Sequence, residues 1–227
     1  MKTQHTILSL VTVLLFVQLA SGQDFVNLDF EQATIAPTPV GGGTYPADPA
    51  QAFPDWTVGY GVVMHNDLSL GSPATVLMGP SFPNFVNYTP LQGSYSVLLQ
   101  FFYLNGNWAG YMPSLSQTGL VPADAQSISL LVSSGTPPSA AVVTMNGVNI
   151  PLISVSGGRL AGDISAYAGS VAQLKISTPD SDDWLYFDDV QFSSSSVPEP
   201  SSYSLMIVCG LLLGWRMKLP PPMRVHR

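Results

Sequence analysis

The chain has 227 residues, a net charge of −7 and one cysteine, Cys209, which excludes an intramolecular disulfide and a cysteine-based zinc site. Between Gln23 and Ser196 thirteen acidic residues face only two cations, Arg159 and Lys175, so this part carries a charge of −11. Such a surface argues against nucleic-acid binding, whereas divalent cations, neutral ligands or simple solubility outside the cell are compatible with it.

A secretory signal peptide is expected at residues 1–22. Lys2 precedes an apolar run, Ile7–Leu19, and Ala20-Ser21-Gly22 supplies a small-residue cleavage site. The run is shorter than the roughly 20 residues of a membrane span, which favours cleavage over an uncleaved anchor. The β-sandwich domain is then expected over residues 23–192, long enough for a single sizeable core.

The first part of this domain combines a strand pattern with a region rich in proline and glycine. Residues 24–31 are expected to form a strand with Leu28 and Phe30 inward and Asp29 and Glu31 outward. The density of proline and glycine predicts that the following residues, 36–54, form a long surface loop without regular structure.

Short strands separated by glycine, proline and asparagine turns dominate the remainder, and a helical turn is expected at 162–168. The strongest hairpin signal is Asn146-Gly147. Helical periodicity is almost lacking, which indicates an all-β protein with the architecture of a β-sandwich. The predicted strands are 56–64 with a glycine bend, 94–103, 127–133, 140–145, 149–155, 171–177 and 185–193.

Short motifs spread over nearly the whole domain resemble the galactose-binding-like jelly roll of many carbohydrate-binding modules. The resemblance implies that the β-sandwich is a jelly roll. The motifs are Asn27-Leu28-Asp29-Phe30-Glu31, Pro54-Asp55-Trp56-Thr57-Val58, Leu91-Gln92-Gly93-Ser94-Tyr95-Ser96-Val97, Ser116-Gln117-Thr118-Gly119, Gly162-Asp163-Ile164-Ser165-Ala166-Tyr167-Ala168-Gly169 and Phe187-Asp188-Asp189-Val190.

Acidic residues at the two ends of the domain are candidate calcium ligands. On the predicted last strand, Asp188 shares the parity of four apolar residues, and an inward carboxylate must be hydrogen bonded or bound to a cation. Oxygen ligands without Cys or His indicate Ca²⁺. The family resemblance implies a structural Ca²⁺ held by Glu31 and by Asp188 or Asp189. Carboxylates hydrogen bonded to loops are the alternative. The four apolar residues are Trp184, Tyr186, Val190 and Phe192.

Aromatic and amide side chains near a turn are candidate sugar ligands, because sugar sites combine aromatic faces with polar hydrogen-bonding groups. Trp108 follows the Asn105-Gly106-Asn107 turn and is either exposed for binding or simply packed, whereas Trp56 and Trp184 are expected in the core. The candidates are Trp108, Asn107, Tyr103 and Tyr111.

The C-terminus combines a proline motif, a short apolar run and scattered cations. A Ser/Pro linker, 193–200, contains Val197-Pro198-Glu199-Pro200 and precedes the segment 201–227. Its apolar run, Leu205–Trp215, even when extended to 13 residues covers only about 20 Å of a ~30 Å hydrocarbon core. This layout resembles the PEP-CTERM sorting tail of exported bacterial proteins. The resemblance implies an exosortase-type sorting enzyme as partner, and a protein that is membrane-anchored through this segment or released after cleavage.

The sequence gives little support for catalysis. No serine in a nucleophile-elbow motif accompanies His65, and no pair of carboxylates can be assigned as the acid and base of a glycosidase. The expected function is therefore that of a non-catalytic cell-surface or extracellular matrix protein that associates with extracellular polysaccharide. The alternatives are a structural envelope or matrix component without a specific ligand and, third, a glycan-active enzyme.

Overall fold

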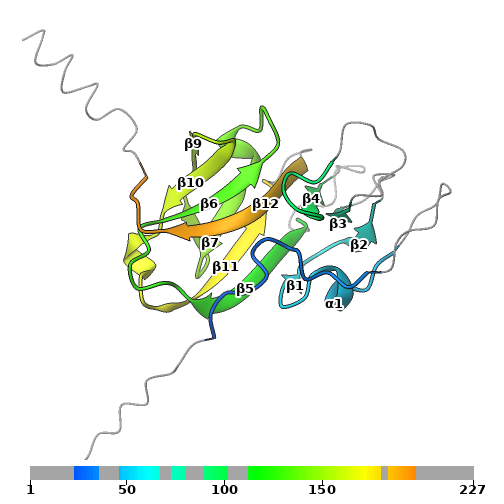
Figure 1. Cartoon of the computed structure of the whole chain (residues 1–227), viewed down its shortest axis with the longest axis horizontal. Coiled ribbons are helices and arrows are strands. Elements are labelled where there is room, and N and C mark those ends of the chain that lie inside the picture. Colours follow the sequence, from blue (N-terminus) through cyan, green and yellow to red (C-terminus); the bar gives the residue numbers. More distant parts are fainter. Residues whose placement is uncertain are drawn as a thin grey trace, which may run out of the picture.

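The structure is a computed structural model that describes residues 23–35, 46–66, 73–79, 89–101, 112–179 and 184–197, and these form an all-β sandwich (Figure 1). One sheet has five strands in the order β1-β5-β11-β7-β8, and all its neighbours are antiparallel. These strands are β1 Thr57–Val58, β5 Ser114–Leu120, β11 Val171–Ser177, β7 Val142–Met145 and β8 Val148–Ile150.

The other sheet has seven strands in the order β2-β3-β4-β12-β6-β10-β9, of which only β2 and β3 pair in parallel. Among the described residues, the α-helical turn α1, Pro49–Ala52, precedes β1, and two 3₁₀ turns, Pro138–Ala140 and Ser165–Tyr167, lie between β6 and β7 and between β10 and β11. The strands of this sheet are β2 Val62–His65, β3 Ala74–Met78, β4 Ser96–Gln100, β12 Trp184–Ser193, β6 Ser127–Val132, β10 Arg159–Asp163 and β9 Ile153–Val155.

The core lies between the two sheets, and several strands contribute every second side chain to it. On β11, for example, Ala172, Leu174 and Ile176 are buried in the core, whereas Gln173 and Lys175 are exposed. The strands predicted at 127–133, 171–177 and 185–193 are therefore confirmed, and so is the hairpin at Asn146-Gly147, which joins β7 and β8. Period-two alternation found β6 and β11 because each turns one face to the core, whereas β12 is buried on both faces from Leu185 to Val190.

The prediction of a first strand at 24–31 is wrong. Asp24 forms an isolated bridge to Leu120, and the residues that follow it run through turns. Asn27 and Phe30 both have positive φ angles, 50° and 59°, which no strand tolerates. The amide side chain of Gln117 accepts a hydrogen bond from Val26 N and donates one to Val26 O. These contacts, which are distant in sequence, hold the segment in its irregular path.

Two further expectations in the next segment are corrected. The described part of the supposed loop 36–54 contains α1, because the Asp48 carboxylate caps its N-terminus through Ala50 N at 2.9 Å. The single strand expected at 56–64 is two strands, β1 and β2, in different sheets. Gly61, at φ 109°, makes the crossing possible, since a Cβ there would lie 2.7 Å from the Pro73 carbonyl oxygen.

A β-bulge in β12 reverses the parity expected for the last strand. The register with β6 shifts between Asp188 and Gln191, and Asp189 has φ 43°. Leu185, Phe187 and Val190 face the core between the sheets, whereas Tyr186 belongs to a smaller cluster on the other face of the seven-stranded sheet. The prediction that Asp188 shares the parity of Val190 and Phe192 is therefore wrong.

The described part of the chain contains no helix with the length and apolar character needed to cross a membrane. The predicted signal peptide, 1–22, and the predicted sorting segment, 201–227, lie outside the described residues.

Candidate functional site

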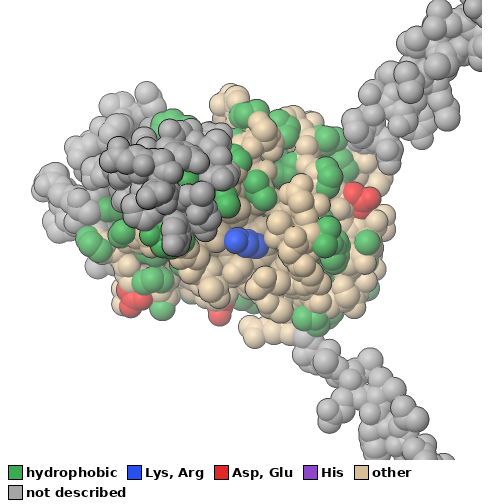
Figure 2. Space-filling view, turned by 180° about the vertical axis from the view of Figure 1, so that it is seen from behind, with side chains coloured by type: hydrophobic (Ala, Val, Ile, Leu, Met, Phe, Trp, Pro, Cys, Tyr) green, Lys and Arg blue, Asp and Glu red, His purple; other side chains and the backbone are tan. Residues whose placement is uncertain are grey.

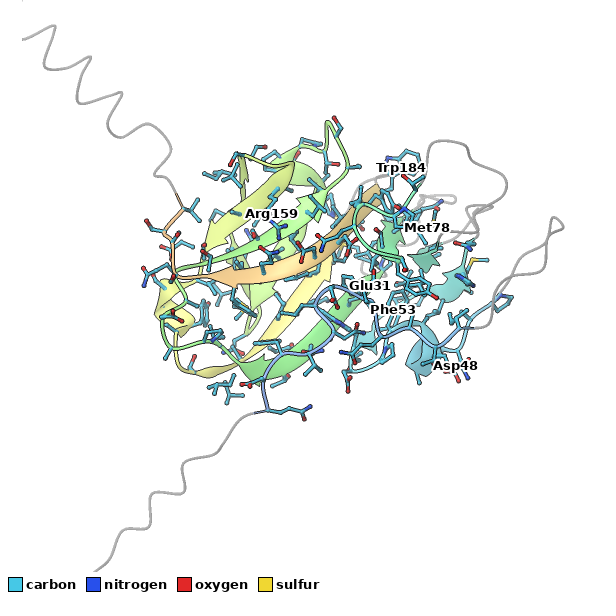
Figure 3. The ribbon with its side chains drawn as sticks, in the orientation of Figure 1. Glu31, Asp48, Phe53, Met78, Arg159 and Trp184 are labelled. Atoms are coloured by element: carbon cyan, nitrogen blue, oxygen red, sulfur yellow. The ribbon has the colours of Figure 1, made fainter. Side chains whose placement is uncertain are left out.

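Glu31 lies against the segment that leads into β4 (Figure 3). Its Oε1 accepts hydrogen bonds from the backbone N–H groups of Ser94 at 2.8 Å and of Tyr95 at 3.0 Å. The contact requires a glycine at position 93, since a Cβ there would lie 2.2 Å from the same oxygen and φ is +56°. Glu31 is therefore the anchor of a tight turn in residues 91–95, which we call the anchored turn.

Asp188 holds the other end of the anchored turn from the opposite terminus of the domain. Its Oδ2 accepts from Gln92 N at 3.1 Å and from Ser96 Oγ at 2.8 Å, and its Oδ1 accepts from Asp189 N at 2.6 Å. Only 1% of Asp188 is exposed. Burial raises the pKa of Asp188 to about 6, against the opposing effect of these hydrogen bonds, and the negative charge of Glu31 adds to the rise.

Asp189 points to a different partner. Its Oδ2 forms an ion pair with Arg159 Nη1 at 2.8 Å and accepts from Gln191 Nε2 at 2.7 Å. Arg159 also donates to Ser129 Oγ at 3.0 Å, so the Arg159 side chain on β10 reaches across β6 and ties both strands to β12. The bulge thus sends two adjacent carboxylates in different directions.

The three predicted calcium ligands are therefore only partly brought together. Glu31 and Asp188 meet on the anchored turn, but Asp189 is neutralised by Arg159. Within residues 23–35, 46–66, 73–79, 89–101, 112–179 and 184–197, no three His, Cys, Asp or Glu side chains are grouped to hold a metal ion. Glu31 Oε1 and both carboxylate oxygens of Asp188 already accept N–H or O–H donors, and a cation would compete with these hydrogen bonds.

A groove of about 260 Å³ opens on the outer face of the seven-stranded sheet. The side chain of Trp184, at the start of β12, is 51% exposed and lies beside it (Figure 3). Tyr186, two residues along the strand, lines the same groove and donates its hydroxyl to Thr89 O at 2.8 Å. The prediction that Trp184 packs in the core is wrong, whereas Trp56 is buried as expected.

The opposite wall of the groove is the turn after β6, which presents hydroxyl groups. Ser133 Oγ and Thr136 Oγ1 lie 2.8 Å apart, and Thr136 N donates to Ser133 O at 3.1 Å, so the turn is internally braced. The described lining contains no charged side chain. Two aromatic rings facing hydroxyls and backbone carbonyls can bind a neutral, partly apolar and partly hydroxylated ligand. The lining is Leu98, Ser133, Ser134, Gly135, Thr136, Pro137, Ala140, Trp184 and Tyr186.

Trp184 was missed because period-two parity assigned it to the same face as Val190 and Phe192. A usable signal was its position directly after the polar run Asp180-Ser181-Asp182-Asp183, which places it at the exposed start of the strand. The predicted sugar ligands Trp108, Asn107, Tyr103 and Tyr111 lie outside the described residues.

Of the sorting motif, Val197 is described and is half-buried, and Pro198, Glu199 and Pro200 lie outside the described residues. Comparison of the chain with protein-family models, with curated proteins and with solved structures finds no match.

Proposed function

We propose that this chain is an exported, non-catalytic protein of the cell surface or extracellular matrix that binds neutral polysaccharide through the groove beside Trp184. The observation that carries the proposal is a half-exposed Trp184 beside a groove whose described lining offers hydroxyl groups and no charged side chain, in a domain that is strongly acidic. Ligand sites are commonly lined by aromatic side chains with a few polar groups, and the ring face suits the apolar face of a pyranose.

A jelly-roll, galactose-binding-like form of the sandwich is part of the proposal. The order β4-β12-β6-β10 in one sheet and β5-β11-β7-β8 in the other supports it. The late strand β12 lies between β4 and β6, and the late strand β11 lies between β5 and β7. This insertion of late strands between earlier ones is expected of a jelly roll, which contains two Greek keys.

Export and sorting rest on the two chain ends. The predicted signal peptide and the Pro198-Glu199-Pro200 motif support delivery by the secretory pathway and handling by an exosortase-type enzyme, with membrane attachment through 201–227 before any cleavage. Mass spectrometry of the exported protein tests this, since residues retained beyond Pro200 throughout would contradict processing at the motif.

Replacing Trp184 with alanine is expected to weaken binding to a neutral polysaccharide about tenfold, because truncating an aromatic anchor at the centre of a site costs more than ~1 kcal/mol. Affinity electrophoresis of residues 23–197 in gels containing neutral glucans, galactans or mannans measures this. The melting temperature should stay the same, since the ring is half outside the fold.

Val148→Ala is the matched control, because Val148 is 58% exposed but belongs to the edge strand β8 of the other sheet. The control should bind like the wild type. If no neutral polysaccharide retards the wild-type protein, the binding function is refuted and the role of a structural matrix component without a ligand takes its place.

A structural Ca²⁺ at Glu31, Asp188 and Asp189 stays a prediction, and their geometry fits it poorly because Asp189 is paired with Arg159. If calcium nevertheless binds, millimolar CaCl₂ should raise the melting temperature of a chelator-treated sample, and Glu31→Gln should abolish the rise. An unchanged melting temperature, together with no calcium in elemental analysis, would exclude the site.

A further inference from the structure

The outer face of the five-stranded sheet carries a continuous row of polar side chains, one from each strand. The register places Thr57 beside Ser116, Ser116 beside Lys175, Lys175 beside Thr144, and Thr144 beside Asn149. All five point away from the core, because each has at least one core residue directly beside it in the chain. We call this row, with the adjacent Thr118 and Gln173, the polar face.

The polar face is free of acidic groups in a domain that has many. None of the five strands of this sheet contains aspartate or glutamate, whereas β10 and β12 of the other sheet contribute Asp163, Asp188 and Asp189. The face seen in Figure 2 carries a cationic group, and the acidic groups visible among the described residues lie toward the margin of the molecule.

Lys175 is at the centre of this row. It is exposed, and the one ion pair among the described residues joins Arg159 to Asp189, so Lys175 is not paired with any carboxylate there. Its cross-strand neighbours, Ser116 and Thr144, are hydroxyl side chains that can bond a ligand but cannot neutralise a charge. The face therefore combines one available cation with a surround of neutral hydrogen-bonding groups.

We propose that the polar face binds an extended glycan in which carboxylate-bearing sugars are spaced among neutral ones, with Lys175 as the partner of one carboxylate. Five strands at about 4.8 Å spacing give a row of about 19 Å, enough for several sugar rings. Hydroxyl and amide side chains match the hydroxyls of the neutral rings. A densely charged polyanion fits less well, because a single cation would neutralise little of it and the domain charge of −11 would repel the rest.

This site is separate from the Trp184 groove, which lies on the outer face of the other sheet. The inference rests on the proposed function in one respect, namely that the protein is located where polysaccharides are present. It adds a second point of attachment with different chemistry, and two sites on opposite faces would allow one molecule to link two polysaccharide chains.

Partly methyl-esterified polygalacturonate is the probe, with the fully esterified polymer as its neutral counterpart. The wild-type protein should bind the partly esterified form about threefold to fivefold more tightly, as expected for one exposed ion pair. Lys175→Gln should remove that preference, and Lys175→Arg should keep it. Equal binding of both polymers by the wild type, or an unchanged preference in Lys175→Gln, would overturn the proposal.

A pair of matched charge insertions tests the position of the contact. Thr144→Asp puts a carboxylate beside Lys175, whereas Ser154→Asp adds the same charge on the exposed edge strand β9 of the other sheet. Thr144→Asp should abolish the preference for the partly esterified polymer and Ser154→Asp should preserve it; equal effects would overturn the site.

Trp184→Ala should not change this preference. Loss of neutral-glycan binding in Trp184→Ala therefore reports on the groove, and loss of the preference in Lys175→Gln reports on the polar face.

Discussion

Replacing Phe30 with alanine should lower the free energy of unfolding by about 3–5 kcal/mol, the range for deleting a buried aromatic ring from a core that cannot collapse around the gap. Phe30 is fully buried, and its ring centroid lies 5.4 Å from that of Trp56, 5.6 Å from Phe187 and 6.4 Å from Phe53. The two contacts with Phe187 and Phe53 are edge-to-face, a geometry that contributes beyond the area buried.

The loss should be large because Phe30 joins parts of the chain that are remote in sequence. Phe187 belongs to β12, Phe53 follows α1, and Trp56 donates its Nε1–H to Asn27 O at 2.9 Å. Removal of the ring therefore loosens the irregular segment 24–31 from the sandwich, including Glu31 and its bonds to the anchored turn.

Urea unfolding followed by tryptophan fluorescence measures the effect, with Phe25→Ala as the control of identical chemistry. Phe25 is only half-buried and has one close ring partner, Phe192 at 5.1 Å. Its loss should cost clearly less than the loss of Phe30. Equal destabilisation by the two variants would show that Phe30 is not the centre of the aromatic cluster.

How far the sequence predicts this fold depends on whether a segment is held by local or by distant contacts. The strands β6 and β11 alternate because one face is buried in the core, and that pattern is visible in the sequence. Residues 24–31 alternate almost as well, yet they form turns. Their path depends on Gln117, which is 91 residues from Val26, and on Trp56, which is 29 residues from Asn27.

The candidate site also depends on contacts between distant parts of the chain, which the sequence pattern does not reveal. Parity alone cannot reveal the bulge after Asp188, which turns Asp189 toward Arg159 and places Trp184 and Val190 on opposite faces. The meeting of Glu31 and Asp188 was expected only through the family resemblance, because no local pattern connects residues so far apart. The polar face was equally hidden, since its row exists only once the strand register is known.

The second large effect expected is a pH dependence of stability that comes from Asp188. Its pKa in the folded protein is raised to about 6, above the value of an exposed aspartate, so the folded state binds this proton more readily than the unfolded state. The stabilisation from Asp188 is thus complete below about pH 4 and is lost as the pH rises through 6. The difference between the folded and unfolded pKa values corresponds to roughly 2–3 kcal/mol across that window.

His65 acts in the opposite direction and must be separated. Burial lowers its pKa, so its contribution to stability is lost as the pH falls below about 6.5, the value in the unfolded chain. Comparing the wild type with Asp188→Asn at each pH cancels this contribution, because both proteins contain His65. The destabilisation caused by Asp188→Asn should therefore be about 2 kcal/mol larger at pH 4.5 than at pH 7.

Urea unfolding of both proteins at pH 4.5, 5.5, 6.5 and 7.5, in chelator and without added calcium, measures this difference. Burial favours the protonated carboxyl of Asp188, whereas its three hydrogen-bond donors favour the ionised carboxylate. The experiment shows which of these two effects is larger. If Asp188→Asn costs more at pH 7 than at pH 4.5, the hydrogen bonds from Gln92, Ser96 and Asp189 outweigh desolvation. Glu31→Gln should reduce the pH dependence without removing it, because burial contributes more to the raised pKa than the charge of Glu31 does.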